Sequence, residues 1–154
     1  MSTYTATVLW TRQADEIFRD NKYSRTHVWS FDGGISVLAS AAPGHVPPAT
    51  AKPDAVDPEE AFVASLSSCH MLFFLYYAAQ WGAVIDRYED VATGTLAKNE
   101  AGRFWISSVI LAPQITWGEG KVPTEAELET LHHKAHADCY IANSVRTEVT
   151  VRTS

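Results

Sequence analysis

The longest apolar stretch of the chain covers residues 61–79 and predicts a central helix. Asp57 and Pro58 precede it, and Glu60 follows Asp57 by three residues, which is the pattern of a capped helix start. Gly82 supplies a stop signal. We therefore expect a helix of roughly six or seven turns. Because its second half is apolar on nearly every face, we expect it to be buried all round.

The remaining chain shows strand patterns on both sides of this helix. Alternating or β-branched residues predict strands over residues 3–12, 25–31, 35–40, 85–96, 103–116 and 144–152, and a second helix over residues 124–138. Asp32-Gly33-Gly34 favours a tight hairpin turn. Residues 13–24 are polar and predict a loop or one short helical piece, and residues 41–56 predict a proline-containing loop. The order β-ββ-α-ββ-α-β, without repeat or linker, predicts one α+β domain over residues 1–154.

Composition narrows the possible functions. The 154 residues carry a net charge of −6 and no basic run, which argues against nucleic-acid binding. The first residues lack the charge and apolar core of a secretory signal, so we expect a cytoplasmic protein. Serines and a histidine interrupt the apolar stretch at 61–79, and this predicts a core helix and no membrane span.

Two cysteines, Cys69 and Cys139, are the candidates for chemistry. In a reducing compartment such a pair is redox-active, metal-binding or simply buried. His132, His136 and Cys139 fall on one helical face and are the candidate metal site, with His133 beside them. No second ligand pair is spaced nearby, and we expect neither metal nor other cofactor. The histidines then line a pocket or cap the helix end.

The run Pro58-Glu59-Glu60-Ala61-Phe62, the small-residue helix to Cys69 and the late Cys139 together resemble the OsmC/Ohr family. Its members are osmotically inducible and organic-hydroperoxide-resistance proteins. The resemblance implies an α+β fold with antiparallel-rich sheets and a long central helix, in an intertwined homodimer with active sites at the subunit interface. It also implies thiol peroxidase chemistry with Cys69 as peroxidatic and Cys139 as resolving cysteine.

The same resemblance assigns the catalytic arginine to Arg25 and its acidic partner to Glu59. Arg19 and His27 are the rival candidates for the arginine's role. A Gly-Arg turn typical of the organic-hydroperoxide branch is absent around Arg25.

The chemistry can also be argued from the residues. A thiolate cleaves the peroxide bond, and an ordinary cysteine is mostly a thiol at neutral pH. Burial on an apolar helix disfavours the thiolate further, so reactivity demands a nearby cation such as arginine. Ten residues of straight helix between Glu59 and Cys69 span about 15 Å. Arg25 then bridges both only if the helix is broken before Cys69 or if one member comes from a second subunit.

The sequence thus predicts a homodimeric peroxidase for organic hydroperoxides, hydrogen peroxide or both, recycled by an external thiol or dithiol reductant. The alternative is a small-molecule binding protein on the same fold, whose thiols are not catalytic. Thiol reactivity separates the two, because a binding protein needs no acidified Cys69.

Overall fold

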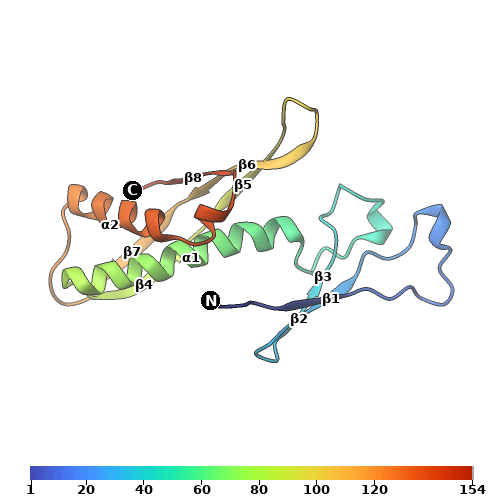
Figure 1. Ribbon diagram of the computed structural model, residues 1–154, viewed down its shortest axis with the longest axis horizontal. Coiled ribbons are helices and arrows are strands. Elements are labelled where there is room, and N and C mark those ends of the chain that lie inside the picture. Colours follow the sequence, from blue (N-terminus) through green and yellow to red (C-terminus); the bar gives the residue numbers. More distant parts are fainter. Residues whose placement is uncertain (154) are drawn as a thin grey trace. The chain divides into compact units, whose positions relative to one another are not determined.

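The computed structural model describes residues 1–153 and divides into two compact units, Met1–Ala61 and the chain from Phe62 onward. Helix α1 (Pro58–Trp81) begins in the first unit and continues into the second (Figure 1). The architecture is mixed α+β, with one long helix and mainly antiparallel sheets. It confirms the fold class that the sequence predicts.

The first unit contains a three-stranded antiparallel sheet in the order β1-β2-β3. Its strands are β1 (Ala6–Leu9), β2 (His27–Phe31) and β3 (Ser36–Ala39). Gly34 turns the chain between β2 and β3 with a φ of 83°, which is why the sequence has glycine there. The 3-10 helix η1 (Phe18–Asp20) is the short helical piece that was one of the two predictions for residues 13–24. The 3-10 helix η2 (Pro48–Thr50) lies in the segment predicted as a proline-containing loop.

The second unit corrects the prediction of two long strands after α1. The strands are β4 (Ile85–Asp90), β5 (Thr93–Lys98), β6 (Phe104–Leu111) and β7 (Pro113–Trp117). β4 pairs with β7 in one sheet, and β5, β6 and the final strand β8 (Glu148–Val151) form another. β6 and β8 are parallel, whereas the other pairs are antiparallel.

The interruption of the long strands has a local cause. The Asp90 carboxylate accepts a hydrogen bond from the Ala112 N–H (2.7 Å), so that amide is not used in a strand ladder. Pro113 follows and has no N–H to donate. Each predicted strand is therefore divided at this point, although Asp90 still faces Pro113 and Thr93 faces Ile110 across the pair.

Helix α1 starts and stops as the sequence predicts. The Glu60 N–H donates to Asp57 Oδ1 (2.8 Å), and the Asp57 N–H donates to Glu60 Oε2 (3.2 Å), which completes a capping box. At the other end Gly82 adopts a φ of 97°, and both its N–H and that of Ala83 bond to Ala78 O (3.2 and 3.0 Å).

The expectation that α1 is buried all round is not met within the second unit. Its buried residues recur every fourth position, at Leu66, His70, Phe74 and Ala78. On the opposite face Leu72 and Tyr76 are 61% and 55% exposed. The helix is long and apolar enough to cross a membrane by those criteria alone, which core helices of soluble proteins also meet. One apolar face of α1 is therefore left uncovered within the second unit.

Helix α2 (Glu125–Asp138) is held at its start by a capping box between Thr124 and Glu127. It lies beside α1 in the second unit (Figure 1), and Leu131 and Ala135 join Phe74 and Ala78 in one buried cluster. A second cluster packs Leu66 of α1 against β6. The first of these clusters fixes α2 against the second half of α1.

Candidate active site

Cys139 is the residue that ends α2, and it is held on several sides. It is 1% exposed. Its N–H donates to His136 O (3.3 Å), and its carbonyl accepts bonds from the N–H and the Nδ2 of Asn143 (both 3.0 Å). Its Sγ accepts a hydrogen bond from the Ala142 N–H (3.4 Å). The backbone turn after α2 therefore fixes the direction of this sulfur.

The two cysteine side chains are neighbours, although they are seventy residues apart in the sequence. Both are free thiols, and Cys69 on α1 is half-buried. Burial raises the pKa of Cys139 to about 11, and hydrogen bonding with the Cys69 side chain adds to the rise. The edge of Phe73 meets the ring of Tyr140 at 5.1 Å, which adds a contact between α1 and the residue after Cys139.

A buried pair of histidines joins the two helices that carry the thiols, with His70 next in sequence to Cys69 on α1 and His132 on α2. His70 Nε2 and His132 Nδ1 are 3.0 Å apart, and the two rings stack with centroids 5.3 Å apart. Phe74 stacks on His132 at 4.2 Å. Burial lowers the pKa of each histidine to about 4, so both are neutral at pH 7. This pair supplies no positive charge to a thiolate.

Polar groups from β4 border the same part of α1. Asp90 accepts a short hydrogen bond from the Ser67 hydroxyl as well as the bond from Ala112. Burial, with the nearby Asp90, raises the pKa of Tyr88. Among the described residues, the buried His70 Nδ1, His136 Nδ1 and Tyr88 hydroxyl have no hydrogen-bond partner.

The candidate metal ligands on α2, His132, His136 and Cys139, do not come together as one group in the described residues. His132 bonds to His70, His133 is exposed, and Cys139 adjoins Cys69. Within residues 1–153, no three His, Cys, Asp or Glu side chains are grouped in a way that could hold a metal ion.

Arg25 lies in the first unit, just before β2, and its guanidinium is bound by its own loop. Nη2 donates to the carbonyl and to the Oδ1 of Asn21 (3.1 and 2.8 Å), and Nη1 donates to the Tyr23 carbonyl. The guanidinium carbon also lies 3.7 Å from the centre of the Tyr23 ring. Loop contacts therefore occupy three of the five N–H donors of this side chain.

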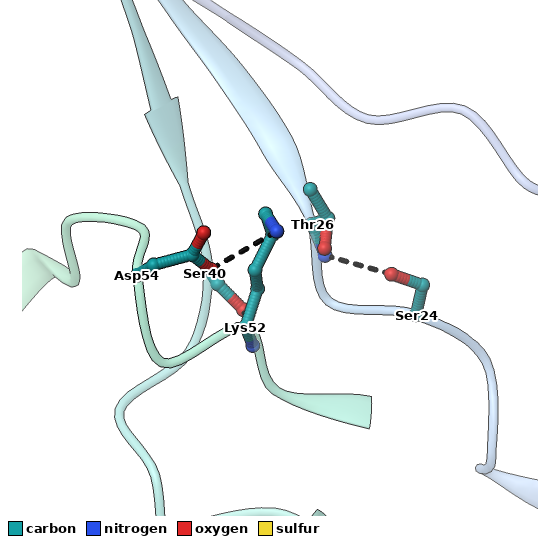
Figure 2. A network of polar contacts seen from close by, with 5 residues as sticks. All are labelled: Ser24, Thr26, Ser40, Lys52 and Asp54. Atoms are coloured by element: carbon teal, nitrogen blue, oxygen red, sulfur yellow. Dashed lines mark hydrogen bonds and ion pairs between the residues drawn. The ribbon is translucent and has the colours of Figure 1, made fainter. Parts of the chain in front are cut away.

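The backbone around Arg25 is fixed as well. The Ser24 hydroxyl oxygen accepts a bond from the Thr26 N–H (3.1 Å), and Arg25 lies between these two residues (Figure 2). The Arg25 N–H donates to Thr50 O (2.8 Å). The neighbouring loop is held by the Lys52 N–H, which donates to Ser40 Oγ (3.0 Å). The Lys52 ammonium also pairs with Asp54 (3.0 Å; Figure 2).

An aromatic cluster supports the loop that contains Arg25; its members are Trp10, Phe18 and Tyr23. Tyr23 stacks on Phe18 at 4.6 Å and meets Trp10 edge-on at 5.3 Å. The rival Arg19 belongs to η1, and His27 bonds through Nδ1 to the Arg25 carbonyl (2.8 Å). Sequence reasoning missed Asn21 and Tyr23 as partners of Arg25. The aromatic residues at 10, 18 and 23 were the signal that the polar segment has a small core.

Glu59 lies in the first turn of α1 and is half-buried. The ion pairs in the described part of the chain are Lys52–Asp54 and Arg87–Glu89, so Glu59 and Arg25 are not paired. Helix α1 runs unbroken from Pro58 to Trp81. Arg25 could bridge Glu59 and Cys69 if the helix were broken before Cys69 or if one member came from a second subunit. The unbroken α1 excludes the first of these.

A long helix beside antiparallel sheets, with two free thiols where a second helix ends, defines a small α+β protein with a dithiol site. The chain belongs to the OsmC family, because the family model described as OsmC-like protein matches residues 51–154. This confirms the resemblance read from the sequence.

Solved structures agree with this assignment. An OsmC-like protein of unknown function from Vibrio cholerae is 49% identical, with 99% of each chain covered and a TM-score of 0.96. An organic hydroperoxide resistance protein from Elizabethkingia anophelis is 21% identical, with 100% of this chain and 98% of that chain covered and a TM-score of 0.71. One from Bacillus subtilis is 21% identical, with coverages of 97% and 98% and a TM-score of 0.67. None of the curated proteins matches the chain significantly.

Proposed function

We propose that this protein is a cysteine-based peroxidase that reduces organic hydroperoxides, hydrogen peroxide or both. The observation that supports it is that the only two thiols of the chain, Cys69 and Cys139, are neighbours between α1 and the end of α2. A peroxidase that forms a disulfide needs such a pair. The two hydroperoxide resistance proteins of similar fold add support for the class of substrate.

The proposed cycle has three steps. The Cys69 thiolate attacks one peroxide oxygen, the O–O bond breaks, and the alcohol leaves after taking up a proton. The resulting Cys69 sulfenic acid condenses with the Cys139 thiol, which forms a disulfide and releases one water. An external thiol or dithiol then reduces the disulfide by exchange. No metal, flavin or haem takes part in these steps.

The arginine assignment remains part of the proposal. Because α1 is unbroken, Glu59 and Cys69 are about 15 Å apart along one helix. A single Arg25 cannot bridge both within one chain. We therefore propose that Arg25 acts beside Cys69, oriented by Glu59, in a homodimer where the two sides of the site come from different subunits.

The uncovered face of α1 supports the homodimer. Leu72 and Tyr76 are exposed there on a helix whose polar residues are few, and exposed apolar patches mark interfaces. Sedimentation should show a dimer at micromolar concentration, and Leu72→Lys should shift it towards monomer. A stable, folded wild-type monomer at that concentration would contradict this assignment.

We further propose a cytoplasmic location and a thiol or dithiol reductant as the partner, because a reducing compartment returns a cysteine pair to the thiol form. The protein is not proposed to bind nucleic acid or membrane.

The test of the peroxidase is the pair of serine variants. Cys69→Ser should reduce peroxide consumption to background, because an alcohol does not replace a thiolate in attack on the peroxide bond. Cys139→Ser should allow one attack per chain but no efficient recycling, with Cys69 passing to sulfinic acid in excess peroxide. Stopped-flow turnover with several peroxides and reductants, and intact mass after one equivalent of peroxide, measure both.

Undiminished turnover by Cys69→Ser would overturn the proposal. Slow alkylation of Cys69 with no peroxide turnover by the wild type would favour the alternative of a binding protein with non-catalytic thiols. If the wild type forms only intermolecular disulfides, the resolving thiol belongs to another molecule.

A further inference from the structure

Tyr140 follows Cys139 in the sequence and is 69% exposed, yet its ring contacts a residue of α1. That residue is Phe73, and the two ring centroids lie 5.1 Å apart in an edge-to-face arrangement. We propose that Tyr140 is a positioning residue, which rests on Phe73 and thereby holds the turn that begins at Cys139 over Cys69 for the resolving attack. This inference rests on the proposed function and deepens it, because it concerns the step that forms the disulfide.

Two positions on α1 lie on either side of Cys69 along one face of the helix. Leu66 precedes Cys69 by three residues, and Phe73 follows it by four. Residues at these spacings are neighbours on a helix surface, with about 5–6 Å between their Cβ atoms. Because α1 is unbroken here, a segment that contacts the helix at both positions passes close to Cys69.

The turn after α2 meets α1 at both of these positions. Ile141 and Ala142 pack against the buried cluster that contains Leu66. One residue earlier in the turn, the ring of Tyr140 meets the ring of Phe73. The turn therefore lies over the part of α1 between the two positions, and it has one apolar anchor and one aromatic anchor there.

Hydrogen bonds within the turn connect the sulfur of Cys139 to these anchors. The N–H and the Nδ2 of Asn143 both donate to the Cys139 carbonyl (3.0 Å each). The Ala142 N–H donates to Cys139 Sγ (3.4 Å), and the Ser144 hydroxyl donates to the Tyr140 carbonyl (2.7 Å). The turn thus holds its own shape, and its side-chain contacts with α1 decide where the sulfur lies along that helix.

The aromatic anchor differs from the apolar one in what it contributes. Ile141 and Ala142 are partly buried and belong to the packing of the core, so they stabilise the unit whatever the chemistry. Tyr140 leaves most of its surface exposed, so it buries little apolar area. Edge-to-face aromatic pairs are nevertheless favourable and directional. The contact therefore serves to orient the turn on α1 more than to stabilise the fold.

The test uses the disulfide reagent dithiobis-nitrobenzoate, and no peroxide is needed. The reagent attaches a thionitrobenzoate group to Cys69, the more exposed thiol, and releases one thionitrobenzoate anion. The Cys139 sulfur then attacks the Cys69 sulfur, the bond between Cys69 and the thionitrobenzoate group breaks, and a second anion leaves while the Cys139 proton passes to solvent. The absorbance of the anion separates the two phases, and the rate of the second measures how well Cys139 is positioned.

Tyr140→Ala should slow the second phase by roughly threefold to tenfold, the effect expected for the loss of one aromatic pair, and should leave the first phase unchanged. Tyr140→Phe keeps the ring and should restore the wild-type rate. Tyr4→Ala removes an exposed tyrosine from the first unit and should change neither phase. A variant that merely unfolds would instead expose both thiols and speed the first phase, so a slower second phase alone reports positioning.

Phe73→Leu tests the contact from the α1 side. It should also slow the second phase, and the double variant with Tyr140→Ala should be no slower than Tyr140→Ala alone. Additive losses would overturn the proposal, as would an unchanged second phase in Tyr140→Ala. A wild-type second phase whose rate rises with protein concentration would overturn it too, because the attacking thiol would then belong to another molecule. Since no peroxide is used, failure of the peroxidase assay and failure of the positioning role are separate results.

Discussion

The cysteine pair and the Arg25 loop hold the groups assigned to catalysis, and they are built in opposite ways. Cys69 and Cys139 come from distant parts of the sequence and meet because α2 packs on α1. Arg25 is bound by Asn21 and Tyr23, which lie within four residues of it. The cysteine pair therefore depends on the packing of a whole unit, whereas the arginine depends on one short loop.

The two regions also differ in their electrostatics. Beside the cysteines are two neutral imidazoles, and Cys139 itself keeps its proton at neutral pH. Arg25 carries a permanent charge, and carbonyl oxygens and an aromatic ring hold its guanidinium. A change in pH should therefore alter the charge and stability of the thiol region. A single substitution in the Arg25 loop should be enough to displace the guanidinium.

The largest expected effect is acid destabilisation of the thiol region. His70 and His132 have pKa values of about 4 in the folded protein against an ordinary value of 6.5. The unfolded chain therefore binds more protons as pH falls. Their contribution to stability is complete above about pH 6.5 and is lost towards pH 4, by at most about 1.4 kcal/mol per pH unit for each group. Urea unfolding at several pH values measures this slope.

Matched histidine variants on α2 locate the effect. His132→Gln removes one titrating group and should flatten the slope between pH 6.5 and 4, whereas His133→Gln, at an exposed position on the same helix, should leave it unchanged. Hydrogen exchange should show the loss at the α1–α2 contact and not in the Arg25 loop. An identical slope in wild type and His132→Gln would show that the buried pair does not govern acid stability.

The next effect concerns the charge on Arg25. If its guanidinium acts on the Cys69 thiolate, Arg25→Ala should raise the midpoint of Cys69 alkylation by one pH unit or more, about 1.4 kcal/mol per unit. Arg25→Lys should restore only part of the reactivity, because an ammonium lacks the planar fork. Arg19→Ala and His27→Ala are the comparison variants. An unchanged midpoint in Arg25→Ala, with a shift in either of these, would move the role to that residue.

Local signals in the sequence predicted much of the fold. The capped start of α1, the start of α2 near residue 124 and the turn at Gly34 were expected, since each depends on residues within a few positions of one another. The division of the long strands was not expected. It depends on the Asp90 side chain reaching the Ala112 N–H, a contact between residues 22 positions apart.

The same distinction applies to the candidate site. Cys69 and Cys139 were predicted as a pair through the family resemblance, and their proximity needs the tertiary packing of α1 and α2. The bond between His70 and His132 joins residues 62 positions apart, and no periodicity in the sequence indicates it. The binding of Arg25 is local, but it depends on Asn21 adopting a φ of 60°, a conformation unusual for a residue other than glycine.

A smaller effect should come from the ring beneath Arg25. Tyr23→Ala removes the aromatic face, which lies 3.7 Å from the guanidinium, and leaves the carbonyl acceptor in place. A cation–π contact at a partly exposed site is worth about 0.5–1 kcal/mol, so Cys69 alkylation at pH 7 should slow by roughly twofold to fivefold. Tyr23→Phe keeps the ring and should behave as the wild type.

The double variant with Tyr23→Ala and Arg25→Ala tests whether Tyr23 acts through Arg25. If Tyr23 positions the arginine, Tyr23→Ala should add nothing to the alkylation rate of Arg25→Ala. Additive losses would mean that Tyr23 supports the fold of the loop through Phe18 and Trp10 instead.

The smallest effect is expected at Glu59, which forms no ion pair with Arg25 within the first unit. Glu59→Gln removes the carboxylate that would orient the arginine and leaves the positive charge itself, so it should slow alkylation less than Arg25→Ala. It also removes a negative charge from the first turn of α1, where such charges contribute about 0.3–1 kcal/mol to helix stability.

Glu60→Gln separates these two consequences, because it removes an equal charge from the same turn, and glutamine still completes the capping box with Asp57. Both variants should lose a similar small amount of stability in urea. Only Glu59→Gln should slow Cys69 alkylation, and only in protein that sediments as a dimer, since the unbroken α1 keeps Glu59 away from the Cys69 of its own chain. Equal alkylation rates in the two variants would reduce Glu59 to a helix-start charge and leave Arg25 oriented by Asn21 and Tyr23 alone.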